Sequence, residues 1–218
     1  MISPSDTKNF LSFLQILRAS DRGSKLILTA ATPLTPWRGP DENPLTYIAP
    51  HAELLDYVAL MNYDIWGGWS ETTGPNAPLD DACAPAAAQA GSASSAVAAW
   101  TLAGFPPHKV VLAVPAYGRG FSVNATSAFS DDGSLNLYTG FNSSNTPVGD
   151  RWSDGTEPEE LDACGNPQGN SGSYNYWGLV EAGYISANGT VAPGVKHGYD
   201  ECSQTVSGGT CFDVSNRL

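Results

Sequence analysis

Residues 60–69 read LMNYDIWGGW, and this segment predicts the fold more directly than any other part of the sequence. The apolar run Tyr57–Met61 is continuous, as in a strand of a parallel sheet that is covered on both faces. Tyr63 and Asp64 follow it, and α/β proteins place their binding sites at such strand ends. The segment therefore predicts an α/β fold with a site here, although a core tyrosine and a turn aspartate would give the same local pattern.

Further strands and helices are expected on either side of this segment. The expected strands are Lys25–Ala30, Tyr57–Tyr63 and Lys109–Val114, and the expected helices between them are Tyr47–Leu55 and Ser92–Leu102. A helix before the first strand would place four apolar side chains on one face: Phe10, Phe13, Leu14 and Leu17. This alternation of helix and strand argues for parallel strands joined by crossovers.

The composition of the sequence changes after Phe121. Residues 121–204 are rich in Gly, Ser, Asn and aromatic side chains and show no long helical period. Such a stretch is too long for one loop, so a second structured region is expected.

Several motifs resemble glycoside hydrolase family 18, the chitinases and their relatives. They occur in family order and include the Met-x-Tyr-Asp of the sixth barrel strand and the Tyr-Gly-Arg that ends the seventh: Met61–Asp64, Pro75–Leu79, Val110–Phe121, Tyr176–Glu181 and Tyr199–Gln204. The resemblance implies a partial TIM (β/α)8 barrel that comprises strands five to seven, with an α+β insertion domain after strand seven. The implied division is 1–120 for the barrel part and 121–204 for the insertion, which leaves 205–218 unassigned.

The same resemblance implies hydrolysis of β-1,4-linked N-acetylglucosamine in chitin by a retaining, substrate-assisted mechanism. Tyr63 and Asp64 match the catalytic positions that hold the acetamido group and stabilise the positive charge of the intermediate. The substrate-binding positions implied along the cleft are Met61, Trp66, Trp69, Tyr117, Arg119 and Trp177, although any single tryptophan could equally be part of a core. No metal or other cofactor is implied.

The family's strand-four signature, Asp-Gly-x-Asp-x-Asp-x-Glu, does not occur in this chain. Its last residue is the general acid, so we expect a fragment that lacks the front of the barrel and strand eight and is inactive alone. Two alternatives stay open. One is a chitin-binding, lectin-like relative that is not an enzyme, and the other is a fragment without a stable fold or function.

Charge and cysteines bear on partners and compartment. The net charge of −12 argues against nucleic acid and anionic membranes and would suit chitin or chitooligosaccharides, although solubility alone would also explain it. Four cysteines, too widely spaced for a zinc site, predict disulfides or free thiols, and three Asn-x-Ser/Thr sequons after residue 121 favour a secreted glycoprotein. Of the three possible pairings, Cys202 with Cys211 and Cys83 with Cys164 is the one expected.

Overall fold

The computed structural model describes residues 5–154, 161, 164–166 and 169–209. The chain divides into two compact units, which are described separately. Unit 1 comprises Met1–Tyr63, Pro78–Cys83 and Gln89–Val114, and unit 2 comprises Asp64–Ala77, Ala84–Ala88 and Pro115–Leu218. The boundary that bears on the site falls between Tyr63 and Asp64.

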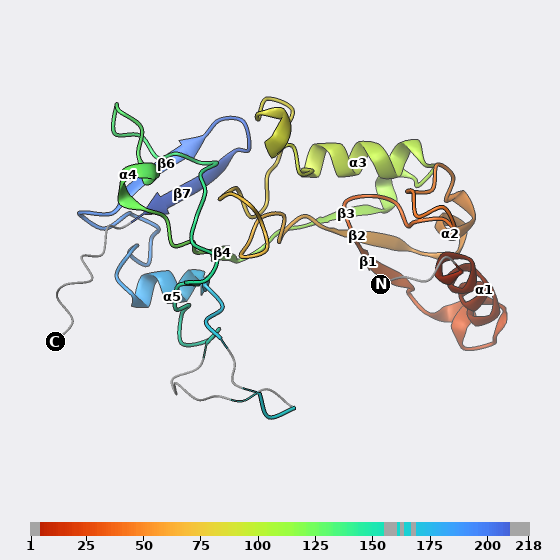
Figure 1. The fold of residues 1–218 in the computed structure, drawn as a ribbon. Helices are drawn as coiled ribbons and strands as arrows, with labels where there is room; N and C mark the ends of the chain where they lie inside the picture. Colours follow the sequence, from red (N-terminus) through yellow and green to blue (C-terminus); the bar gives the residue numbers. More distant parts are fainter. Residues whose placement is uncertain (1–4, 155–160, 162–163, 167–168, 210–218) are drawn as a thin grey trace. The chain divides into compact units, whose positions relative to one another are not determined.

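Unit 1 is built on a parallel three-stranded sheet in the order β1-β2-β3 (Figure 1). The strands are β1 (Thr29–Thr32), β2 (Tyr57–Met61) and β3 (Val110–Ala113). In the register, Ala59 lies opposite Ala31 on one side and Val111 on the other. The predicted α/β arrangement with parallel strands is confirmed. The first strand begins four residues later than predicted because Gly23–Lys25 forms a 3-10 turn, η1, before it.

Three helices pack with this sheet: α1 (Asp6–Ala19), α2 (Ala49–Leu54) and α3 (Ala93–Leu102). Ser92 caps α3 by accepting a hydrogen bond from the Ser95 amide, which satisfies one of the free N–H groups at the helix start. Two short 3-10 turns, η2 (Ala86–Ala88) and η3 (Pro107–Lys109), lie on either side of α3 in the sequence. The core contains large buried side chains from helices, strands and loops: Leu14, Ile48, Leu55, Val58, Leu60, Trp100 and Phe105.

The predicted apolar face of α1 is only partly correct. Leu14 is buried and Phe10 packs against the core, where its ring meets that of Trp37 at 5.4 Å. Phe13, in contrast, is exposed. The face that packs is therefore narrower than the hydrophobic pattern suggests.

In its described residues, unit 2 contains two antiparallel strand pairs and two short α-helices. Strand β4 (Tyr117–Arg119) pairs with β5 (Ser173–Asn175), and β6 (Lys196–Asp200) pairs with β7 (Thr205–Gly209). The helices are α4 (Ala125–Ala128) and α5 (Tyr176–Glu181). Strand β7 lies in the stretch that the sequence motifs left unassigned. The domain boundaries at 120 and 204 stay a prediction.

Among the described residues, two cysteines are disulfide-bonded. Cys83 and Cys202 are both disulfide-bonded, whereas Cys164 is exposed and is not part of a disulfide. The expected pairing of Cys83 with Cys164 is therefore wrong, because sequence distance says little about which sulfurs meet in space. Cys211 lies outside the described residues.

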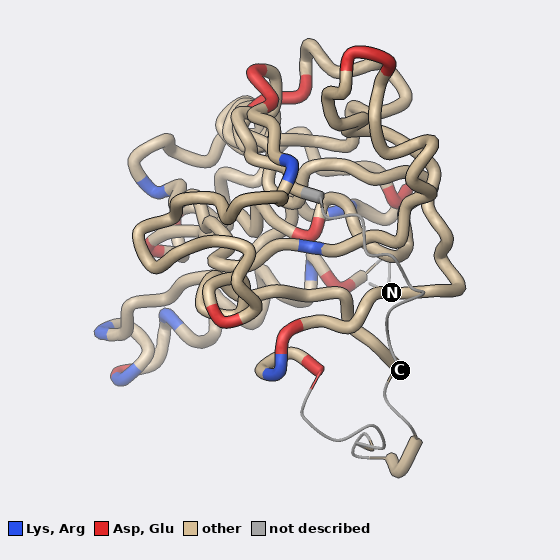
Figure 2. Tube along the Cα trace, turned by 90° about the vertical axis from the view of Figure 1, so that its left-hand side faces the viewer, with Lys and Arg blue, Asp and Glu red and all other residues tan. Residues whose placement is uncertain are grey.

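Lys and Arg are spread along the described part of the chain mostly as single residues (Figure 2). Within that part, no helix has both the length and the apolar character needed to cross a membrane.

Candidate functional site

Asp64 follows β2 by three residues and lies where the sequence predicts a site. Its backbone is in the left-handed region, with φ of 56°, which is uncommon for a residue other than glycine. Asn76 holds this conformation, because its Oδ1 accepts from the Asp64 amide at 3.0 Å and its carbonyl accepts from the Ile65 amide at 3.2 Å. An unusual backbone that is held by specific partners is a common feature of functional sites.

Three donor atoms converge on one oxygen of Asp64. The Tyr117 hydroxyl donates to Oδ1 at 2.7 Å, and Arg119 donates to the same oxygen through Nε at 3.0 Å and Nη2 at 2.5 Å. Tyr117 and Arg119 are two residues apart on β4, so their side chains point to the same side of the strand. The strand thereby presents both donors to Asp64 at once.

The environment keeps the Tyr117 hydroxyl protonated. Burial, followed by the hydrogen bond to Asp64, raises the pKa of Tyr117 to about 12. At neutral pH the phenol is therefore a hydrogen-bond donor and carries no charge.

An exposed aromatic side chain lies beside this pair. The Arg119 guanidinium carbon lies 5.1 Å from the Trp69 ring centroid and 5.5 Å from that of Tyr117, within the range of cation–π attraction. Trp69 is 61% exposed. Its ring folds back over Gly67 so closely that a Cβ on Gly67 would overlap it. We call Asp64, Trp69, Tyr117 and Arg119 the Asp64 cluster.

Two residues that sequence reasoning missed complete the surroundings of the Asp64 cluster. Asn76 also donates through Nδ2 to the Tyr117 carbonyl at 3.2 Å, and Ser173 on β5 accepts from Arg119 Nη1 at 3.0 Å. Asn76 lies in the Pro75–Leu79 motif, which was the available signal for it. Ser173 gave no signal, because its role depends on the pairing of β4 with β5.

The other residues predicted to form the site are not part of the Asp64 cluster. Met61 is the last residue of β2 and, like Tyr63, belongs to unit 1. Trp66 is only 7% exposed and packs in a second core with Tyr138, at 5.8 Å between ring centroids. The expectation that Trp66 offers an open platform is therefore corrected, because apolar packing covers its faces. Trp177 lies on α5 and lines a cavity.

The Asp64 cluster combines acceptors, donors and an exposed aromatic face. In the described ranges, no group of three or more His, Cys, Asp or Glu is arranged to hold a metal ion. The cluster itself contains a single carboxylate, which is paired with Arg119 at 2.5 Å. Such an arrangement suits a neutral ligand that has polar groups at its edge and apolar faces.

Unit 1 has an α/β fold, and unit 2 holds the polar and aromatic Asp64 cluster, whose aspartate comes three residues after β2 in the sequence. Residues 2–194 match the model of the glycosyl hydrolases family 18. The chain belongs to this family, and the resemblance seen in the sequence motifs is confirmed.

The relatives found include chitinases and chitinase-like proteins. A chitinase-like effector of Moniliophthora roreri is 43% identical over 206 residues, which cover 94% of this chain and 49% of the relative. A chitinase-like effector of Moniliophthora perniciosa is 42% identical, with 94% and 46% covered. The crystal structure of a chitinase from Rhizomucor miehei superimposes with a TM-score of 0.77 at 29% identity and covers 95% of this chain and 53% of that one. The chain thus spans about half the length of these relatives.

Proposed function

We propose that this chain is the chitin-binding part of a family 18 glycosidase and that the Asp64 cluster contacts an N-acetylglucosamine unit. The convergence of Tyr117 and Arg119 on Asp64 Oδ1 carries the proposal. It fixes a carboxylate, a phenol and a guanidinium beside the exposed ring of Trp69. Sugars need this combination, because their ring faces are apolar and their edges carry hydroxyl and amide groups.

Each residue has a separate role in this proposal. By the matching family positions, Asp64 and Tyr63 orient the acetamido group, and Met61 is a substrate-binding residue. Tyr117 and Arg119 bind hydroxyls, and Trp69 stacks on a sugar face. These assignments rest on the matching family positions and, for the Asp64 cluster, on the contacts described above.

The proposed reaction of the family is substrate-assisted. The acetamido oxygen attacks the anomeric carbon while a glutamic acid protonates the leaving oxygen, and water then opens the resulting ring. This sequence has no Asp-Gly-x-Asp-x-Asp-x-Glu signature to supply that acid. Asp64, paired with Arg119 at 2.5 Å, orients the substrate instead. We therefore expect the chain to bind chitooligosaccharides and not to hydrolyse them by itself.

In the same proposal, β1, β2 and β3 are strands five, six and seven of a TIM barrel, and residues 121–204 are the insertion domain. The parallel order of the three strands supports the first assignment. The antiparallel pairs of unit 2 support the second, since an α+β insertion contains such pairs.

An extracellular location fits this function. Cys83 and Cys202 are disulfide-bonded, which requires an oxidising compartment. The three sequon asparagines, Asn124, Asn142 and Asn188, are all exposed. Partners would be chitin or its oligosaccharides, and neither nucleic acid nor a membrane is part of the proposal.

A second candidate function is chitin binding without catalysis in the whole protein. The names of the two Moniliophthora relatives, chitinase-like effectors, favour it. The two candidates differ in whether the whole protein carries the glutamic acid of the signature. Release of a chromophore from a chitobioside by the whole protein would distinguish the enzyme from the binding protein.

The test for the chain itself is calorimetric titration with N-acetylchitotetraose, together with a chromogenic chitobioside assay. We expect binding without turnover. Arg119→Met and Trp69→Ala should each weaken the affinity about tenfold, since a hydrogen bond from a charged group or an aromatic stack contributes about 1–2 kcal/mol. Tyr47→Ala, which removes an exposed aromatic ring from unit 1, is the matched control. Absence of binding by the unmodified chain would refute the proposal.

A further inference from the structure

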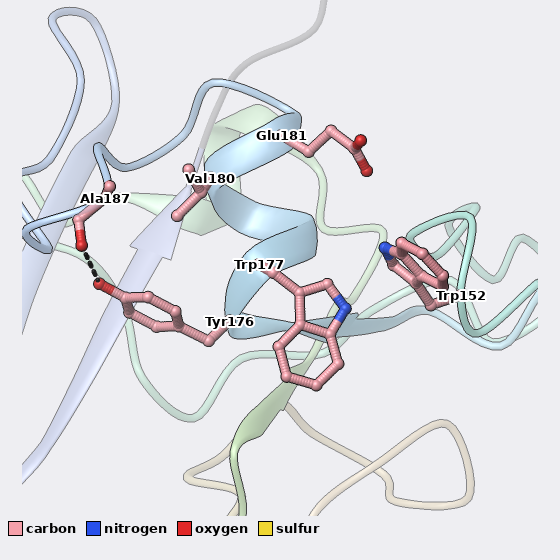
Figure 3. A pocket seen from close by; sticks show the side chains of 6 residues that line it. All are labelled: Trp152, Tyr176, Trp177, Val180, Glu181 and Ala187. Atoms are coloured by element: carbon pink, nitrogen blue, oxygen red, sulfur yellow. Dashed lines mark hydrogen bonds between the residues drawn. The ribbon is translucent and has the colours of Figure 1, made fainter.

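Unit 2 contains a cavity of about 380 Å³ whose residues are not those of the Asp64 cluster (Figure 3). Its volume lies at the lower end of the range of small-ligand sites. Helix α5 provides most of the lining, and a preceding loop and a following turn provide the rest: Trp152, Tyr176, Trp177, Val180, Glu181 and Ala187.

Three aromatic rings of this cavity are open to solvent. Trp152 is 61% exposed, Trp177 53% and Tyr176 44%. Large aromatic side chains usually bury most of their area, so a group of exposed ones marks a binding surface. The three rings therefore need an explanation that packing within the fold does not supply.

Two of the three rings, those of Trp152 and Tyr176, are held in place by specific contacts. The Arg151 guanidinium lies 4.6 Å from the Trp152 ring centroid, and the Tyr176 hydroxyl donates to the Ala187 carbonyl at 3.2 Å. The amide of Tyr176 donates to the Ala116 carbonyl at 3.1 Å, which attaches the start of α5 to the residue before β4. Ordered rings bind with a smaller entropic cost than mobile ones.

One buried carboxylate connects the two indole-bearing segments. Asp150 accepts from the amide of Trp152 at 3.0 Å through Oδ1 and from the amide of Asn175 at 2.5 Å through Oδ2. Gly178 packs against this carboxylate so closely that a Cβ there would overlap it. Asp150 is therefore a positioning residue, since it brings the loop of Trp152 to the beginning of α5.

The charge at the cavity is balanced. Glu181 Oε1 pairs with Arg151 Nη2 at 2.7 Å. Trp177 and Glu181 are four residues apart on α5, so they project from the same face of the helix toward Trp152 (Figure 3). The cavity thus offers aromatic faces, an indole N–H and carboxylate oxygens without a net charge, which favours a neutral ligand that carries hydroxyl groups.

We infer that this cavity is a second sugar-binding site, which takes a free oligosaccharide of β-1,4-linked N-acetylglucosamine. The sugar faces stack on Trp152 and Trp177, and Glu181 accepts from a hydroxyl. The inference rests on the proposed function for the choice of sugar. It goes beyond that proposal because Trp152 and Glu181 have no assigned role and because the site would act in addition to the Asp64 cluster.

The test is calorimetric titration of the chain with N-acetylchitotetraose, combined with NMR of the indole N–H signals. We expect binding at two sites, with the signals of Trp152 and Trp177 shifted by the ligand. Trp152→Ala and Trp177→Ala should each weaken binding at the cavity about tenfold, as expected for the loss of an aromatic stack. Binding at the Asp64 cluster should be unchanged. Glu181→Gln should weaken binding at the cavity without altering α5.

The matched control is Tyr199→Ala, which removes an exposed ring from β6 of the same unit. If Trp152→Ala and Trp177→Ala bind like this control while Trp69→Ala weakens the binding about tenfold, the inference is refuted and the proposed function stands. If the unmodified chain binds no chitotetraose at all, both are refuted. Circular dichroism of each variant establishes that the fold is retained.

Discussion

Asp150 offers a direct test of how unit 2 is held together. The side chain is 6% exposed and accepts hydrogen bonds from three backbone amides, those of Trp152 at 3.0 Å, Ser153 at 2.9 Å and Asn175 at 2.5 Å. Asp150→Ala leaves the amides of Trp152 and Asn175 without this acceptor, whereas the Ser153 amide keeps the Asp150 backbone carbonyl at 3.0 Å. A buried amide that loses its partner costs about 1–3 kcal/mol.

Taking the lower value for each of these two amides, because water can enter near a surface loop, the loss is about 2 kcal/mol. For a chain of this size, 1 kcal/mol corresponds to about 2–4 °C in melting temperature, so the expected decrease is about 4–8 °C. Differential scanning calorimetry measures this decrease, and near-ultraviolet circular dichroism reports on Trp152. The control, Asp131→Ala, makes the same change of charge at an exposed position.

The difference in stability between the unmodified chain and Asp150→Ala should depend on pH, which provides an independent measurement. Burial raises the pKa of Asp150, but the hydrogen bonds from the Asn175 and Ser153 groups and the Trp152 amide outweigh burial and lower it below the ordinary value of 3.8. A carboxyl with a lowered folded pKa contributes its stability above the unfolded pKa and loses it as the pH falls through the folded pKa. The difference in melting temperature between the unmodified chain and Asp150→Ala should therefore become smaller below about pH 3.8. A melting temperature for Asp150→Ala within about 2 °C of that for Asp131→Ala would refute this account of unit 2.

Three further outcomes are expected. Burial lowers the pKa of His51 from 6.5, so the folded state disfavours its protonation and stability should fall as the pH drops below about 6.5; His51→Gln should flatten this slope in thermal melts, and the exposed His108→Gln should not. In Asp64→Asn, the pKa of Tyr117 should fall from about 12 but stay above 10.0, because burial is the larger cause; NMR titration of ring-labelled tyrosine measures it, and an unchanged pKa would contradict the hydrogen bond. Gly67→Ala should displace the ring that folds over this glycine and weaken chitotetraose binding, whereas unaltered binding would show that the ring position is unimportant.

The local sequence pattern was sufficient to predict most of the strands and helices of unit 1. The continuous apolar run at Tyr57–Met61 became the central strand β2, and Ser92 caps the helix that the sequence placed at Ser92–Leu102. Both features depend on neighbours within a few residues, because periodicity and capping are local properties. Position errors arose where a short turn replaced regular structure, as at Gly23–Lys25 before β1.

The site required the tertiary structure. Trp66 and Trp69 are three residues apart in one loop, yet Trp66 is buried beside Tyr138 and Trp69 is exposed beside Arg119. Nothing in the local sequence distinguishes the two tryptophans, because the difference lies in which distant segment packs on each ring.

The polar contacts of Asp64 and the cavity also depend on segments that are distant in the sequence. Asp64 meets donors more than fifty positions away, and the loop of Trp152 is joined to α5 by the buried carboxylate of Asp150. A sequence motif can name the residue types that a site needs, and here it named Asp64. Which oxygen receives which donor, and which aromatic faces stay open, depends on long-range packing, because burial and hydrogen bonding are set by atoms that the chain brings together only when it folds.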